Sequence, residues 1–104
     1  KVMHPIKRIE IISDSIELPK ILRSLKQSQI NRYTVIRNVE SSGVSGTDEN
    51  DATMIDMAYI IAFCSPEQVK DAIEKIRPIL NRFGGSCYVS DAMEVRSLNC
   101  TALL

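Results

Sequence analysis

Apolar and polar residues alternate in four stretches of this 104-residue chain, and two further stretches carry apolar residues at helical spacing. Alternation predicts strands with one buried face, and spacings of three and four residues predict helices that bury one side. We expect strands at 6–12, 33–39, 54–64 and 87–95. The helices fall between the first and second strands and between the third and fourth. The predicted order is therefore strand, helix, strand, strand, helix, strand.

The first helix is expected to begin near Asp14 and Glu17, which have the spacing of a capping box. Pro19 lies close to its first turn, where a missing N–H is best tolerated. Its apolar face consists of Leu18, Ile21, Leu22 and Leu25.

The second helix has a stronger start signal, with Ser65 as N-cap, Pro66 at the first position and Gln68 three residues after the cap. Its apolar stripe is Val69, Ile73, Ile76, Leu80 and Phe83. Pro78 interrupts this stripe and predicts a kink or an early end near Arg77. Gly84 and Gly85 then stop the helix.

These elements predict a ferredoxin-like βαββαβ sandwich of the α+β class in a single domain, 1–104. If both connections through helices are right-handed, the two helices cover the same face of the sheet. The other face stays bare in a monomer and carries Val35 or Ile36 together with Ile60. Apolar residues on a bare face predict self-association, and the long third strand suggests contacts beyond the monomer.

A polar segment, 40–53, separates the second and third strands and is the first candidate for function, because long connections in compact domains are often functional. Its acidic half includes Asp48, Glu49 and Asp51, but the later bidentate Glu of an EF-hand is missing. Such a solvated, self-repelling segment is expected to become ordered only when a ligand or partner binds.

Composition narrows the classes of function. The formal net charge is zero and there is no Trp, which argues against a nucleic-acid partner. No apolar run is long enough to cross a bilayer and no hydrophobic signal region begins the chain, so we expect a soluble, cytoplasmic protein. Three cysteines without CxxC spacing favour neither a disulfide framework nor a zinc site. Cys64 and Cys87 are expected in the core, whereas Cys100 is expected to be more exposed.

No catalytic constellation is present, so an enzyme is not expected. The single histidine, His4, lies beside Pro5 and is expected in a disordered tail. A bound nucleotide would need backbone N–H groups and separate charges, because no Walker-type loop occurs. The candidate nucleotide-binding residues are Gly43, Gly46, Gly84, Gly85, Arg96 and Arg37.

In addition to the order of the predicted elements, several short segments of the sequence resemble those of the PII-like signalling family. They are Tyr33-Thr34-Val35 before the loop, Gly43-Val44-Ser45-Gly46 near its root, and Gly84-Gly85-Ser86-Cys87-Tyr88-Val89 leading into Met93-Glu94-Val95-Arg96. The resemblance covers nearly the whole chain. It implies a homotrimer with adenine nucleotides (ATP, ADP, AMP or cyclic AMP) in clefts between subunits. It also implies that the long loop, called the T-loop, contacts a regulated protein through Ser41, Ser42, Val44, Ser45, Thr47, Asp48 and Glu49.

The chain is most similar to the divergent PII-like group that includes regulators of inorganic-carbon uptake, so the resemblance implies a membrane transporter as target and recruitment to the membrane. The loop has no Tyr, and uridylylation is therefore not expected. Arg96 is followed by Leu98 where the nitrogen-regulating members have a second basic residue, so one of two phosphate anchors is absent. Cys100 has no later Cys with which to close a terminal disulfide.

Two alternatives stay open. The first keeps the fold but not the nucleotide, as a binding module or a sensor of bicarbonate or another anion, and the missing second anchor favours it. The second is a metal-handling relative of the divalent-cation tolerance proteins, for which the Cys and His residues are widely dispersed.

Overall fold

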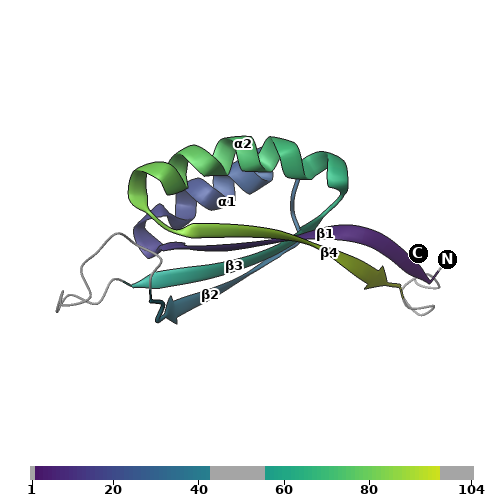
Figure 1. Cartoon of the computed structure of the whole chain (residues 1–104), viewed down its shortest axis with the longest axis horizontal. Coiled ribbons are helices and arrows are strands. Elements are labelled where there is room, and N and C mark those ends of the chain that lie inside the picture. Colours follow the sequence, from purple (N-terminus) through teal and green to yellow (C-terminus); the bar gives the residue numbers. More distant parts are fainter. Residues whose placement is uncertain (1, 43–55, 97–104) are drawn as a thin grey trace.

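A computed structural model describes residues 2–42 and 56–96 of the chain. The elements are β1 (Met3–Asp14), a 3-10 turn η1 (Ser15–Glu17), α1 (Leu18–Gln27), β2 (Tyr33–Val39), β3 (Met57–Cys64), α2 (Pro66–Phe83) and β4 (Ser86–Val95). The four strands form one antiparallel sheet in the order β2-β3-β1-β4. Figure 1 shows both helices on the same face of this sheet. The predicted ferredoxin-like βαββαβ fold is confirmed.

The core lies between the helices and one face of the sheet. Ile9 and Ile11 of β1 are fully buried, and register places them beside Ala62 and Ile60 of β3. The other core residues are Leu18, Ile21 and Leu25 of α1, Ile30 after it, Ala58 and Cys64 of β3, and Ala72 and Ile76 of α2. Partly buried Cys87 packs against them. The expected apolar face of α1 and the core position of both cysteines are thus confirmed, and burial raises the pKa of the Cys87 thiol to about 11.

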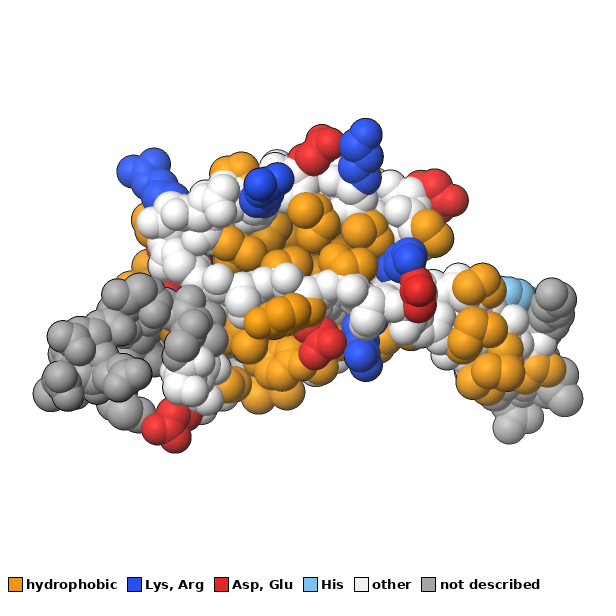
Figure 2. Space-filling view, viewed as in Figure 1, with side chains coloured by type: hydrophobic (Ala, Val, Ile, Leu, Met, Phe, Trp, Pro, Cys, Tyr) orange, Lys and Arg blue, Asp and Glu red, His pale blue; other side chains and the backbone are white. Residues whose placement is uncertain are grey.

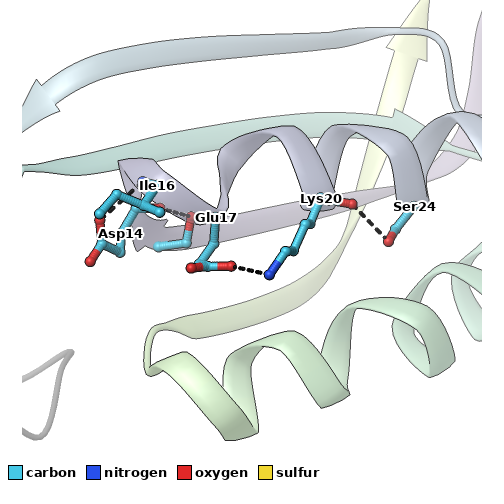
Figure 3. Close-up of polar contacts among 6 residues, drawn as sticks. Asp14, Ile16, Glu17, Lys20 and Ser24 are labelled. Carbon is cyan, nitrogen blue, oxygen red and sulfur yellow. Dashed lines mark hydrogen bonds and ion pairs between the residues drawn. The ribbon is translucent and has the colours of Figure 1, made fainter.

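The first helix begins differently from the sequence prediction (Figure 3). The Asp14 carboxylate accepts a hydrogen bond from the Ile16 N–H at 3.0 Å and so caps the short turn η1. Glu17 does not complete the expected capping box, because its carboxylate forms an ion pair with Lys20 at 3.1 Å instead. The α-helix itself begins at Leu18, and Pro19 lies in its first turn, as predicted.

The second helix begins as predicted and ends at Phe83, directly before the predicted glycine stop. The Ser65 N–H donates to Gln68 Oε1 at 2.7 Å, which satisfies one of the backbone donors left open at a helix start. The helix then continues through Pro78 to Phe83, so of the two outcomes predicted near Arg77, a kink or an early end, the early end is wrong. Only one backbone hydrogen bond is lost to an internal proline, and the packing of the buried Ile76 face holds the helix together.

Two strand boundaries also differ from the prediction. β1 is longer than expected and projects past the helices together with the end of β4, as an arm that carries both described ends of the chain (Figure 1). β3 begins at Met57, and Asp56 precedes it, so the long third strand predicted from 54 is wrong within the described residues. The long element that reaches beyond the two-layer body is therefore the β1–β4 arm.

The face of the sheet away from the helices, which we call the open face, is mixed in character. Register places on it Ile6, Arg8, Glu10 and Ile12 of β1, Ile36 of β2, Tyr59, Ile61 and Phe63 of β3, and Tyr88 of β4. Ile36 is 47% exposed and Tyr88 is 61% exposed. Val35 packs against the core and Ile60 is fully buried within it, so of the residues expected on this face only Ile36 lies there.

A polar network crosses the middle of the open face. The Tyr59 hydroxyl donates to Glu10, Arg8 Nε lies 3.2 Å from Glu10 Oε1, and Arg8 Nε donates to Ser90 Oγ at 3.2 Å. The cation and the carboxylate neutralise each other, so this network adds no net charge to the face.

The turn between α2 and β4 depends on glycine. Gly84 and Gly85 have φ values of 85° and 121°, and the Gly84 N–H closes the helix by donating to the Leu80 carbonyl at 2.8 Å. A Cβ built on Gly85 would lie 2.5 Å from the Ile12 carbonyl oxygen and 3.0 Å from Leu80 Cδ2. The predicted helix stop is confirmed, and the second glycine also allows the backbone to approach the end of β1.

We expect Gly85→Ala to lower the free energy of unfolding by roughly 2 kcal/mol or more, because the new Cβ would combine a disfavoured φ with a backbone clash. Chemical denaturation followed by circular dichroism measures the change. Ser86→Ala is the matched control, since the buried Ser86 hydroxyl has no hydrogen-bond partner among the described residues. Equal stability of Gly85→Ala and the unmodified chain would contradict the role assigned to this glycine.

Candidate functional site

A cleft of about 450 Å³ opens where the β1–β4 arm leaves the body. One side is formed by the arm, through His4, Pro5, Ile6, Glu94 and Arg96, and the other by the connection from α1 to β2, through Gln29, Ile30, Asn31 and Arg32. Phe63 and Cys64, with Ser65 and Gln68 at the start of α2, complete the lining. Its size suits part of a small-molecule ligand.

Backbone and side-chain hydrogen bonds hold the parts of the cleft in place. The Arg96 N–H donates to the Val2 carbonyl at 2.8 Å, which extends the pairing of β1 and β4. The Phe63 N–H donates to the Arg32 carbonyl at 3.1 Å, and Gln68 Nε2 donates to the Gln29 carbonyl at 2.8 Å. The strand ends, the connection and the start of α2 thereby form one continuous wall.

The chemistry of the cleft centres on Arg32, Arg96 and Glu94. A guanidinium nitrogen of Arg32 donates to Glu94 Oε2, and Arg96 Nε lies 3.5 Å from Glu94 Oε1. Both arginine side chains are more than half exposed, whereas the Glu94 side chain is only 22% exposed. The hydrogen bond from Arg32 holds the pKa of the Glu94 carboxyl below its ordinary value. Two exposed cations therefore flank one shielded carboxylate.

The predicted site residues that the structure describes lie at two opposite ends of the sheet. Arg37, Gly84 and Gly85 lie at the end where β2 leaves for the 40–53 loop and β4 begins. Arg37 is exposed and adjoins Asn38, whose φ of 58° marks the irregular pairing of β2 with β3 between Ile36 and Val39. Arg96 lies at the other end, in the cleft. One chain does not bring these residues together.

Of the predicted partner-binding loop, Ser41 and Ser42 are described, and Ser42 is exposed just beyond β2. Outside the described residues lie Gly43, Val44, Ser45, Gly46, Thr47, Asp48 and Glu49, and their assignment to a nucleotide or a partner stays a prediction. Cys100 also lies outside them, so its expected exposure stays a prediction.

Sequence reasoning missed Arg32 and Glu94 as site residues, and it misplaced His4. His4 belongs to β1, pairs in register with Glu94 and lines the cleft, so the expectation of a disordered tail is wrong. The long antiparallel pairing of β1 with β4 orders this end of the chain. The charge of Glu94 at an alternating strand position was an available signal, but its partner Arg32 lies 62 residues away in sequence.

Two further observations on the described residues concern metal binding and membrane spans. Within these residues, no three His, Cys, Asp or Glu side chains gather closely enough to hold a metal ion. The helices in the described ranges also include none that is long and apolar enough to span a membrane.

The described residues thus form a two-layer βαββαβ domain with a charged cleft at one end of its sheet. The sequence matches the family model of the nitrogen regulatory protein P-II over residues 6–99, and the chain therefore belongs to this family. The family resemblance predicted from the sequence is confirmed. A comparison with curated proteins gives no match.

Solved structures of PII-like proteins share the fold. One is CPII from Thiomonas intermedia K12 bound to ADP, AMP and acetate, with 23% identity, a TM-score of 0.79, and coverage of 92% of this chain and 94% of CPII. CPII bound to ADP and bicarbonate shows 24% identity, a TM-score of 0.77 and coverage of 90% and 92%. A candidate PII-like signalling protein from Thermus thermophilus shows 14% identity, a TM-score of 0.74 and coverage of 95% and 98%.

We expect the ion pair with Arg32 to be visible in the titration of Glu94. Because the folded-state pKa is lowered, the pair stabilises the fold above the ordinary glutamate range, near pH 4.3, and this contribution is lost as pH falls through the lower folded value. Arg32→Gln should raise the Glu94 pKa towards that ordinary range, as measured by carboxyl NMR. A Glu94 pKa that is the same in both proteins would contradict the pairing.

Proposed function

We propose that this chain is a non-enzymatic P-II signal-transduction protein that works as a homotrimer, binds an adenine nucleotide between subunits, and regulates a partner protein through the 40–53 loop. The cleft with Arg32 and Arg96 carries the proposal, because paired guanidinium groups recognise phosphate oxygens well. CPII, a protein of the same fold, has been solved with ADP and AMP.

The separation of the predicted site residues supports a shared site. Arg96 lies at the arm end, whereas Arg37, Gly84 and Gly85 lie at the loop end. A single chain cannot use both sets on one ligand, but the arm end of one subunit placed against the loop end of the next can. A nucleotide in that position would contact the root of the loop. Its binding would favour one loop arrangement and thereby change the affinity for the partner. A membrane transporter is the partner that we propose.

The open face supports self-association. Ile36 and Tyr88 are exposed there, and the half-buried side chains of Ile12, Tyr59, Ile61 and Phe63 lie on the same face. The Arg8 and Glu10 charges compensate each other within the chain. An apolar face whose charges are internally paired fits an identical face better than a strongly charged partner.

A second candidate ligand is a small carboxylate-like anion such as bicarbonate. Glu94 itself places a carboxylate between the two arginines, so the cleft already has the geometry for this chemical group. CPII has also been solved with bicarbonate and with acetate. This anion could bind beside a nucleotide or in its place.

The nucleotide proposal is tested by isothermal titration calorimetry with ATP, ADP, AMP and cyclic AMP. We expect at least one of them to bind, and Arg96→Ala to weaken that binding by about tenfold or more through loss of a charge-assisted hydrogen bond. Arg77→Ala, an exposed arginine of α2 outside the cleft lining, is the matched control and should bind normally. Absence of binding by all four nucleotides would refute this part of the proposal.

Self-association is tested by light scattering coupled to size-exclusion chromatography. We expect the unmodified chain to elute at three times its chain mass, and Ile36→Asp to shift it towards the monomer, because burying a new carboxylate in the contact is unfavourable. Ile16→Asp is the control, since Ile16 is 78% exposed on η1, away from the open face. A monomeric unmodified chain would refute the trimer.

A further inference from the structure

We propose that Glu94 is an internal competitor for the anion site, a carboxylate that occupies Arg32 and Arg96 when the cleft is empty and that an incoming anion must replace. The inference rests on the proposed function, because it concerns the same cleft. It adds a residue that sets the affinity of the cleft for anions. The basis is geometric: both Glu94 oxygens are engaged, one by each arginine.

The carboxylate and the arginines differ in their freedom to move. Glu94 belongs to β4, where register pairs it with His4 of β1, and its side chain is mostly covered. Arg32 lies in the connection before β2 and Arg96 just beyond β4, and both guanidinium groups are largely exposed. A ligand that reaches the cleft from solvent therefore meets the arginines first. It can draw them away while Glu94 stays in place.

The contacts of Glu94 with the two arginines compete with an incoming anion, and that anion can still displace them. Both guanidinium groups are largely exposed, so water and an incoming anion reach them and weaken their ion pairs with Glu94. The lowered pKa of Glu94 means that its carboxylate remains charged at neutral pH, and the competitor is therefore always present. Among the described residues, Glu94 is the only acidic side chain that lines this cleft. Its charge alone therefore opposes the binding of an anion.

The arrangement suits anions that offer two oxygens. Glu94 offers one oxygen to each arginine, and a ligand with oxygens spread in a similar way replaces both contacts together. A phosphate, a diphosphate or a small carboxylate can do this, because the single carboxylate of Glu94 itself contacts both arginines. Glu94 therefore lowers the affinity of the cleft for any such anion.

The test measures pyrophosphate and inorganic phosphate binding by calorimetry, with the unmodified chain, Glu94→Gln and the control Glu74→Gln, an exposed glutamate of α2. Glu94→Gln keeps the shape of the side chain and removes the competing charge. We expect it to bind pyrophosphate roughly three- to tenfold more tightly, the size of one nearby charge in a partly solvated site. Phosphate binding should also become tighter, and Glu74→Gln should match the unmodified chain.

Glu94→Asp provides a second variant that keeps the charge but is shorter by one methylene. We expect its pyrophosphate affinity to lie between those of the unmodified chain and Glu94→Gln, because one contact is weakened. Unchanged or weaker pyrophosphate binding by Glu94→Gln, or no binding by it, would overturn the inference. Tighter pyrophosphate binding without any binding of ADP would support the competitor and refute the nucleotide as the natural ligand.

Discussion

The rest of the structure depends on the pairing of β1 with both β3 and β4. This strand lies in the interior of the sheet, and its alternate residues Ile9 and Ile11 are fully buried under the helices. A shift of one residue in either pairing would move these side chains to the open face, so the apolar alternation fixes the register. The same register places Arg8 and Glu10 on the open face beside Tyr59 and Ser90, where their polar groups pair.

The antiparallel register also places different chemistry at the two ends of the domain. The end of β1 lies with the beginnings of β3 and β4, the loop root and the glycine turn. Its beginning lies with the end of β4 in an arm that projects beyond the helices. Figure 2 shows apolar side chains gathered on that projecting end, where Met3, Met93 and Val95 are each about half exposed or more. An arm with so much exposed apolar surface fits a domain that completes its packing with other copies.

Charge in this protein is compensated locally. The chain has no net charge, and its described ion pairs join close neighbours in sequence, such as Arg8 with Glu10, or distant segments, such as Lys7 with Asp91 and Arg32 with Glu94. Long-range attraction of an anion is consequently weak, and recognition must come from close contacts inside the cleft. In the anion site that we propose, Glu94 is therefore as important for anion affinity as the two arginines that it contacts.

The sequence by itself determined the fold, because apolar periodicity, the Ser65 and Gln68 cap and the Gly84 and Gly85 stop are local signals that agree with one another. The resemblance of its residues to the PII-like proteins indicated the family. It also identified Arg96, Gly84 and Gly85 as candidates. Only the tertiary structure decided that α2 continues through Pro78, that Ile60 is in the core, and that His4, Arg32, Glu94 and Arg96 share a cleft. These outcomes depend on packing and on contacts between residues far apart along the chain, and local sequence patterns do not reveal such contacts.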